Sequence, residues 1–338
     1  MHWKLNKIKM KYFLTGATGF VGGCLARQLR DAGHEVVALA RNPEKANSLR
    51  QIGVTVVQGD VTDKESMRAP MQGCDGVYHV AGWYKLGVKD KSPGQQINVN
   101  GTRNVLELMK ELNIPKGVYT STLAINSDTH GAMPDESFHF SGKHISEYDR
   151  TKAAAHDVAD AFIREGLPLV IVMPGLIYGP GGTSMSDEAL RLYLKKKLPL
   201  IPSRAAYCWA HVDDVVRGHI LAMEKAKPGS TYIIAGPAHK LTEAFALAKK
   251  ITGIRKPLTV PPFMLKITAA FSWLAERLFT LPEMYSSEAL RVQAGVTYLG
   301  DNSKARNELG YDPRPLEQGL RQTLEYELAL INQQKKKK

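Results

Sequence analysis

Three glycines at three-residue spacing, Gly16, Gly19 and Gly22, stand between an apolar run at residues 12–14 and a helical pattern. A strand, a glycine turn and a helix in this order form the loop that binds phosphate groups in nucleotide-binding folds. Gly16 permits a tight turn, Gly19 lets the backbone approach a pyrophosphate, and Gly22 allows the helix to pack closely on the strand. The chain is therefore predicted to begin with a dinucleotide-binding unit.

Short apolar and β-branched runs recur after this turn and alternate with helical patterns. The predicted strands cover residues 12–14, 35–40, 54–60, 76–82, 117–121 and 169–173, with one more at 231–234. Strands of this kind, separated by helices, are typical of a parallel sheet that is buried on both faces. The sequence predicts an α/β fold with a Rossmann-type, doubly wound parallel sheet.

The regular alternation fades after Gly182, where proline, aromatic residues and irregular stretches become more frequent. We expect a cofactor-binding Rossmann domain at residues 10–182, with a strand and a helix added from about 211–240. A smaller, C-terminal substrate-binding part is expected from 183–210 and 241–330. The basic segment 331–338 is expected to be a disordered tail.

The composition is that of an ordinary globular chain, with 338 residues, 43% hydrophobic and 23% charged. The formal net charge is +12, but seven of these charges are lysines at the two ends, so the rest carries only +5. No basic helix is interleaved with aromatic residues, which argues against a nucleic-acid partner. The three cysteines, Cys24, Cys74 and Cys208, lack the spacing of metal ligands, so no metal site is expected.

No apolar run is long and uncharged enough to span a bilayer. The nearest candidate, residues 262–281, is interrupted by Lys266, Glu276 and Arg277, and is expected to be an amphipathic helix of the core or of a lid. The start of the chain does not resemble a signal peptide, and Met10 is a possible functional start. A cytoplasmic location is expected.

The residue after the second predicted strand indicates which nucleotide binds. An acidic side chain there accepts hydrogen bonds from the adenosine ribose and repels a 2′-phosphate. This chain has Ala40 followed by Arg41, with Lys45 one turn later. Because a guanidinium can bind a phosphate through two hydrogen bonds, we expect NADP to be favoured, with NAD possible.

A tyrosine and a lysine four residues apart, Tyr148 and Lys152, precede the predicted strand at 169–173. On a helix they lie one turn apart on the same face. An ammonium beside a phenol would favour the phenolate, so that Tyr148 could exchange a proton with an oxygen while hydride moves at the adjacent carbon. The pair is predicted to be catalytic.

The glycine pattern with Ala17-Thr18 inside it, and the later Tyr-x-x-x-Lys pair, resemble the extended branch of the short-chain dehydrogenase/reductase superfamily. The resemblance runs from about residue 11 to about residue 330. It implies that Thr122, after the fifth predicted strand, orients the substrate oxygen, with Ser121 just before it. It also implies that Lys152 holds the cofactor ribose. The cofactor-binding residues it implies are Gly16, Thr18, Gly19, Phe20, Val21, Gly22, Arg41, Asp60, Val61, Val80, Ala81, Gly82, Lys152 and Pro174.

Two departures from the sugar-nucleotide members of this branch bear on the substrate. Those enzymes usually carry an asparagine where this chain has Leu176, and dehydratases usually carry an acid beside the catalytic hydroxyl, which Leu123 and Ala124 do not supply. Apolar walls suit a hydrophobic carbonyl better than a sugar diphosphate. The expected pocket comprises Trp83, Tyr84, Leu123 and Leu176, and other apolar candidates are Leu86, Phe138, Phe140, Phe263, Met264, Phe271 and Trp273.

The sequence thus favours an NADP-dependent reductase of a ketone or aldehyde, similar to dihydroflavonol 4-reductase and 3β-hydroxysteroid dehydrogenase. The alternative enzyme is a nucleotide-sugar epimerase or dehydratase with tightly bound NAD. The alternative outside catalysis is a cofactor-sensing regulator, against which the intact catalytic set argues. The resemblance also implies a homodimer through the helices at 97–112 and 146–163.

Structural roles are expected for three further polar residues. Asn100 is expected to tie backbone segments together. His211 and Asp213 are expected to cap the start of a helix.

Overall fold

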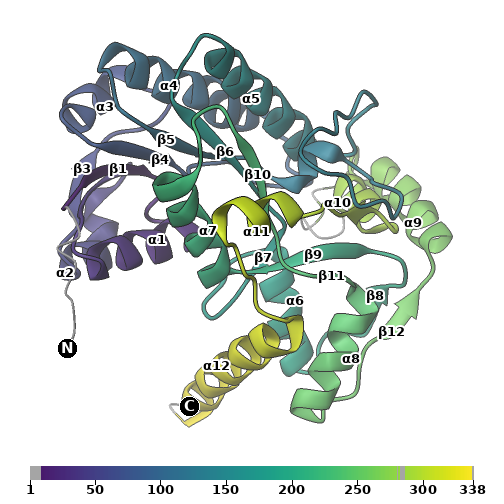
Figure 1. Cartoon of the computed structure of the whole chain (residues 1–338). Helices are drawn as coiled ribbons and strands as arrows, with labels where there is room; N and C mark the ends of the chain where they lie inside the picture. Colours follow the sequence, from purple (N-terminus) through teal and green to yellow (C-terminus); the bar gives the residue numbers. More distant parts are fainter. Residues whose placement is uncertain (1–8, 280, 282–285, 337–338) are drawn as a thin grey trace.

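The computed structural model describes residues 9–279, 281 and 286–336, and its centre is a parallel sheet of seven strands (Figure 1). The strand order is β10-β6-β5-β4-β1-β2-β3, which is that of a Rossmann fold. The strands are β1 (Lys11–Thr15), β2 (Glu35–Ala40), β3 (Thr55–Gln58), β4 (Gly76–His79), β5 (Gly117–Thr120), β6 (Leu169–Pro174) and β10 (Thr231–Ile234). All seven predicted strands are present, and the predicted fold class is confirmed.

Helices cover both faces of this sheet, as buried apolar strands require. One face carries α3 (Lys64–Met71), α4 (Gly101–Glu111) and α5 (Glu147–Arg164). The other carries α1 (Phe20–Asp31), α2 (Asn47–Gln51), α7 (Val212–Lys225) and α11 (Ser303–Leu309). Two separate apolar cores result, one on each side of the sheet.

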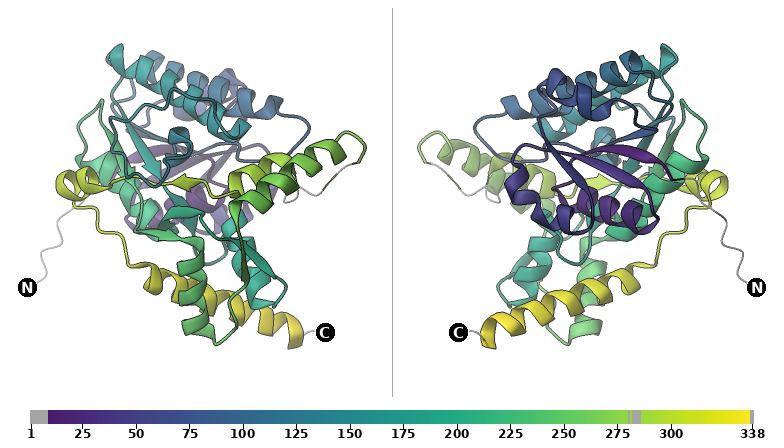
Figure 2. Two further views of the ribbon diagram at one scale, coloured as in Figure 1. Left: turned by 90° about the vertical axis from the view of Figure 1, so that its right-hand side faces the viewer. Right: turned by 90° about the vertical axis from the view of Figure 1, so that its left-hand side faces the viewer.

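The C-terminal part lies below the carboxyl edge of the sheet in Figure 1 and has its own apolar core. Its larger sheet joins β7 (Leu176–Tyr178), β9 (Ala206–His211), β11 (Ala238–Lys240) and β13 (Thr297–Tyr298), and β8 (Leu200–Pro202) pairs with β12 (Leu258–Val260). Its helices are α6 (Met185–Leu194), α8 (Leu241–Thr252), α9 (Pro262–Ala275), α10 (Ser287–Gln293) and α12 (Leu316–Lys336). Figure 2 shows that α9 projects from the body to one side.

The structure adds two details near the expected domain boundaries. Strand β7 pairs with β9 in the second sheet, so the first continuous segment of the Rossmann sheet ends with β6 at Pro174, and the boundary at residue 182 stays a prediction. Helix α11, expected in the substrate-binding part, packs instead on β10 and α7 of the Rossmann unit.

The expected disordered tail at 331–338 is also corrected. Helix α12 continues to Lys336 within the described residues, while Lys337 and Lys338 lie outside them. The helix extends this far because Leu320, Leu324, Leu328 and Ile331 recur at helical spacing and pack on the third core. Among the helices of the described residues, none combines the length and apolar composition needed to cross a bilayer.

Candidate active site

The glycine turn between β1 and α1 forms a cradle made of backbone atoms. Gly16 has a φ of +76°, and a Cβ there would lie 2.6 Å from the amide nitrogen of Ala81. A Cβ on Gly22 would overlap the carbonyl oxygen of Gly16, so α1 approaches the turn as closely as backbone allows. No side chain caps the start of α1 at Gly19, and no acidic residue lies in its first turn. These free amides and the positive end of the helix dipole fit the pyrophosphate of a dinucleotide.

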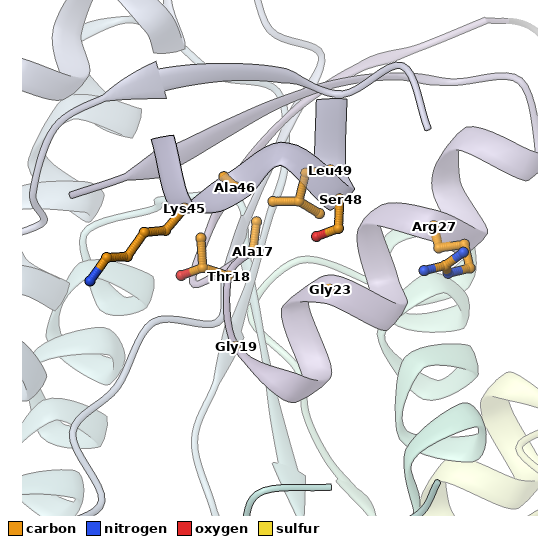
Figure 3. Close-up of a pocket in the computed structure, with 9 residues that line it drawn as sticks. All are labelled: Ala17, Thr18, Gly19, Gly23, Arg27, Lys45, Ala46, Ser48 and Leu49. Carbon is orange, nitrogen blue, oxygen red and sulfur yellow. The ribbon is translucent and has the colours of Figure 1, made fainter. Parts of the chain in front are cut away.

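A small cleft of about 170 Å³ adjoins this turn, on the side of α1 that faces the segment after β2 (Figure 3). Thr18 and Lys45 lie close together in the view, and Arg27 enters from α1. Strand β2 ends at Ala40, and the exposed Arg41 follows directly. The residues that line this cleft, close to where the adenosine ribose binds in Rossmann folds, therefore include two cations, Arg27 and Lys45, and no carboxylate.

The remaining expected cofactor residues lie at the carboxyl ends of the parallel strands. Asp60 follows β3, and its Oδ1 accepts hydrogen bonds from the backbone and hydroxyl of Thr62 at 2.9 Å each. Val61 is buried against Gly101 at the start of α4. The segment of Val80, Ala81 and Gly82 follows β4, and Pro174 is the last residue of β6.

The hydroxyls of the predicted catalytic residues Tyr148 and Thr122 lie beside each other. Tyr148 lies in the first turn of α5, and Thr122 caps the short helical turn after β5. Ser121 is not part of this pair, because its Oγ lies 2.8 Å from Nδ1 of the buried His156. Burial raises the pKa of Tyr148 to about 12, although the neighbouring hydroxyl of Thr122 lowers it. The phenol is therefore protonated at neutral pH.

Lys152 lies one turn beyond Tyr148 and is 5% exposed. Its Nζ donates to the carbonyl oxygen of Thr120 at 2.7 Å and to the hydroxyl of Tyr119 at 3.2 Å. Burial lowers the pKa of Lys152 to about 7. Burial is the main cause of both shifts, so the expected lowering of the Tyr148 pKa by Lys152 stays a prediction.

A buried polar chain, which the sequence reasoning missed, runs from Lys152 to the strand that leads into the glycine turn. The Tyr119 hydroxyl lies beside that of Thr102, which lowers the pKa of Tyr119, and Oγ1 of Thr102 lies 3.0 Å from Nε2 of His79. Nδ1 of His79 lies 2.7 Å from Oγ1 of Thr15. Burial lowers the pKa of His79 to about 3, so the imidazole is neutral and can donate at one nitrogen and accept at the other. The signal in the sequence is a polar residue at the end of an apolar strand, as at Thr15 and His79.

The backbone tie expected of Asn100 is made by Asn98 instead. Asn100 is exposed, whereas the buried Asn98 accepts from the Trp83 amide at 2.7 Å and donates to the Trp83 carbonyl at 3.0 Å. Its Nδ2 also donates to Oγ1 of Thr151 on α5 at 2.9 Å. A π-helical stretch at residues 94–100 turns Asn98 inward, a register that the sequence pattern does not reveal.

Glu288 of α10 links the C-terminal part to the start of the catalytic helix. It is 5% exposed, and its Oε1 accepts from the backbone amide of Glu147 at 2.6 Å. Its Oε2 accepts from the amide of Gly87 at 2.9 Å and lies 3.4 Å from Nζ of Lys91. One carboxylate thus holds α10, the segment after β4 and the residue before Tyr148. The sequence reasoning did not identify it.

Asp149, next to Tyr148, is buried and turned toward β13. It accepts from Oγ of Ser146 at 2.7 Å and from the hydroxyl of Tyr298 at 3.0 Å. Burial raises its pKa to about 6, with a contribution from the charge of Glu288.

The four expected pocket residues differ in exposure. Tyr84 is exposed and Leu176 is half-buried on β7. Trp83 is buried against Gly94 and Thr151, and Leu123 is buried in the core.

The expected helix cap at His211 is confirmed. The Nδ1 of His211 accepts from the amide of Asp213 at 3.3 Å at the start of α7.

Comparison with known proteins identifies the family. A sequence model of the NAD dependent epimerase/dehydratase family matches residues 12–235. The chain belongs to this family. It is an NAD(P)-dependent oxidoreductase of the short-chain dehydrogenase/reductase type, as the resemblance predicted.

Two relatives and one solved structure illustrate the range of this epimerase/dehydratase family. A putative dihydroflavonol 4-reductase from Synechocystis is 32% identical over 91% of this chain and 92% of its own. The 4-hydroxy-2-methyl-3-oxo-4-farnesyl-3,4-dihydroquinoline-1-oxide ketoreductase from Stigmatella aurantiaca is 29% identical over 92% of this chain and 95% of its own. The crystal structure of gox2253 superposes with a TM-score of 0.82 at 29% identity, covering 95% of this chain and 99% of that one.

The low pKa of Lys152 predicts a pH dependence of stability in the absence of cofactor. The native lysine loses its proton near pH 7, whereas in an unfolded chain it does so near 10.4, so between these values the unfolded state holds one more proton. The free energy of unfolding should rise with pH in this window, by at most about 1.4 kcal/mol per pH unit from this group.

Urea unfolding of wild type and Lys152→Met at several pH values between about 6 and 9 tests this. The variant should lack the rise, and Lys110→Met, which removes an exposed lysine of α4, should keep it. Parallel curves for wild type and Lys152→Met would contradict the assignment.

Proposed function

We propose that the protein is an NADP-dependent reductase of an apolar ketone or aldehyde. In this proposal Tyr148 gives a proton to the carbonyl oxygen, Thr122 hydrogen-bonds the same oxygen, and Lys152 holds the cofactor ribose. The bound nicotinamide cofactor supplies the hydride that adds to the carbonyl carbon, and the product is an alcohol. The alternative within the family is an epimerase or dehydratase of a nucleotide sugar with tightly bound NAD.

The observation that carries the proposal is the protonated phenol of Tyr148 beside the hydroxyl of Thr122. The pKa of Tyr148 is raised to about 12, so the proton is in place before the substrate arrives. A carbonyl oxygen that replaces one partner of the hydroxyl pair would accept hydrogen bonds from both residues. As hydride reaches the carbon, negative charge grows on this oxygen, and proton transfer from Tyr148 neutralises it.

The preference for NADP is supported by the cations at the end of β2. Arg41 is exposed there, and Lys45 lines the adjoining cleft with Thr18. A 2′-phosphate adds negative charge at this place, which cations stabilise and an acidic residue would repel.

The preference for an apolar carbonyl is supported by Leu176 and by two relatives. Leu176 stands where an amide side chain would otherwise be available to a sugar nucleotide. The similar proteins from Synechocystis and Stigmatella aurantiaca are named as reductases, and the name of the latter gives its substrate a farnesyl chain. Each name describes the relative and supports the same class of substrate here.

We also propose an oligomeric state and a cellular location. A homodimer would pair α4 and α5 of one subunit with those of its partner, and α5 carries small half-buried side chains at Ala153, Ala154 and Ala161. The cytoplasm is the proposed location.

A panel of carbonyl compounds and nucleotide sugars, scored by NADPH consumption, tests the proposed reaction. Apolar aromatic or alicyclic ketones and aldehydes should give net oxidation of NADPH with one equivalent of alcohol. UDP-sugars should neither be converted nor raise the melting temperature. Sugar interconversion without net change in cofactor, or a large melting shift that saturates at low UDP-sugar concentration, would establish the epimerase alternative instead.

The cofactor preference should depend on Arg41. NADPH should bind the wild type more tightly than NADH, and Arg41→Asp should reverse this order, with a loss of roughly 1.5–3 kcal/mol for NADPH from one charge-assisted contact. Fluorescence titration with both cofactors measures it. Arg103→Asp, at an exposed arginine of α4 on the opposite face of the sheet, is the control and should keep the wild-type preference. Equal affinities of the wild type for both cofactors would refute the proposal.

Substitutions of Tyr148 and Thr122 should separate chemistry from binding. Tyr148→Phe should leave cofactor affinity nearly unchanged and lower turnover by about 10²–10⁴, the usual contribution of a positioned acid or base. Thr122→Ser keeps the hydroxyl and should be tolerated, whereas the nearly isosteric Thr122→Val should not. Turnover and cofactor affinity are measured separately on folded variants. Full activity of Tyr148→Phe on a confirmed substrate would show that the proton comes from another group.

A further inference from the structure

Helix α9 (Pro262–Ala275) presents its large apolar side chains to solvent and its small ones to the protein. The buried positions are Ala269 and Ser272, whereas Phe271 is 69% exposed and Leu274 is 54% exposed. Helices of globular proteins have the opposite arrangement, with large apolar residues on the inner face. Because exposing such side chains to water is unfavourable, a continuous apolar face of this kind marks a surface that contacts a nonpolar partner.

The exposed residues form one stripe along the helix. Phe263, Ile267, Phe271 and Leu274 follow one another at intervals of three or four residues, and all are exposed. Met264 lies beside this stripe, and Leu278 in the turn after the helix continues it. Helix α9 packs on α10 and projects from the body in Figure 2. The exposure of the stripe residues shows that no described element covers this face.

The charges around the stripe are positive. Lys266 and Arg277 are exposed near its two ends, and Arg255 and Lys256 precede the helix. From residue 255 to 279 the chain has four cations and a single carboxylate, Glu276.

That carboxylate is turned inward, away from the exposed stripe. Its two oxygens accept from the amide and the hydroxyl of Ser287 at the start of α10.

An aromatic–cation pair stands beside the stripe. The guanidinium carbon of Arg277 lies 3.8 Å from the ring centroid of Trp273, which is half exposed. Tryptophan and arginine each combine an apolar body with a polar tip, and both are favoured at the level of lipid headgroups.

We propose that α9 is a docking helix that lies in the surface of an anionic lipid bilayer. An apolar face with cations beside it, toward which no carboxylate of the described residues turns, is complementary to acyl chains beneath negative headgroups. The stripe has no hydrogen-bonding side chain that would specify a protein partner, which favours a nonspecific, nonpolar medium over a second copy of the chain. The helix lies in the bilayer surface and does not cross it.

The proposal goes beyond the reductase function and does not require it. Its test therefore uses the full chain without substrate or cofactor. Vesicles of phosphatidylcholine with about one third phosphatidylglycerol are mixed with the protein and floated on a density gradient at about 0.15 M salt. The wild type should float with the vesicles.

Substitution of a carboxylate for one aromatic residue of the stripe provides the contrast. Phe271→Glu should lower the partition coefficient at least about tenfold, because it replaces a large apolar group with a charge that anionic headgroups repel. The control is Tyr326→Glu, which makes the same exchange at an aromatic residue that is 44% exposed on α12, away from α9 in Figures 1 and 2. It should float like the wild type. Circular dichroism and melting temperature verify folding, and Leu274→Ser replaces Phe271→Glu if that variant unfolds.

A second measurement reports where the helix lies. Lipids with brominated acyl chains should quench tryptophan fluorescence in the wild type, and Trp273→Phe should lose most of this quenching. Equal vesicle binding by wild type and the stripe variants would overturn the proposal, because lysines elsewhere would then account for it. Absence of vesicle binding, together with an oligomer that Phe271→Glu dissociates in sedimentation velocity, would overturn it in favour of a second copy.

Discussion

The close contact between the start of α1 and the turn that precedes it is the constraint on which the site depends. A side chain at Gly22 would overlap the Gly16 carbonyl, and one at Gly16 would meet the Ala81 amide. Backbone atoms therefore contact one another directly where three segments come together. These are the turn after β1, the start of α1 and the segment after β4. This packing leaves the first amides of α1 free of side-chain caps and directs them toward the same sheet edge as Tyr148 and Thr122.

Burial, rather than an ion pair, determines the protonation of the two ionisable groups Tyr148 and Lys152. Lys152 is held by a carbonyl oxygen and a hydroxyl, and Tyr148 has the hydroxyl of Thr122 beside it. A charge that has only neutral partners is costly in a buried site. Burial therefore raises the pKa of Tyr148 and lowers that of Lys152, so that each neutral form is favoured. Such a site responds strongly to any charge that enters it, including the phosphates and the nicotinamide ring of a cofactor.

Much of the fold and part of the site could be predicted from the sequence because the relevant signals are local. Apolar runs identify all seven strands, and the spacing of Tyr148 and Lys152 places both on one face of α5. The roles of Asn98 and Glu288 could not be predicted, since each depends on contacts between segments far apart in the chain. Asn98 bonds a residue 53 positions away, and Glu288 bonds one 141 positions away. The extent of α12 was missed for a similar reason, because its last turns are lysine-rich while its inner face packs on α6 and α8.

The carboxylate of Glu288 couples helices α9 and α10 to the catalytic helix α5. Glu276 at the end of α9 accepts hydrogen bonds from Ser287, the first residue of α10, and the next residue, Glu288, accepts from the amide of Glu147, which precedes Tyr148. A force applied to α9 therefore reaches the first turn of α5 through two carboxylates. The same carboxylate also accepts from the amide of Gly87 in the segment after β4, and Ala81 of that segment lies against Gly16 in the glycine turn. Strain imposed at the periphery would consequently reach both the proton donor and the nucleotide-binding turn.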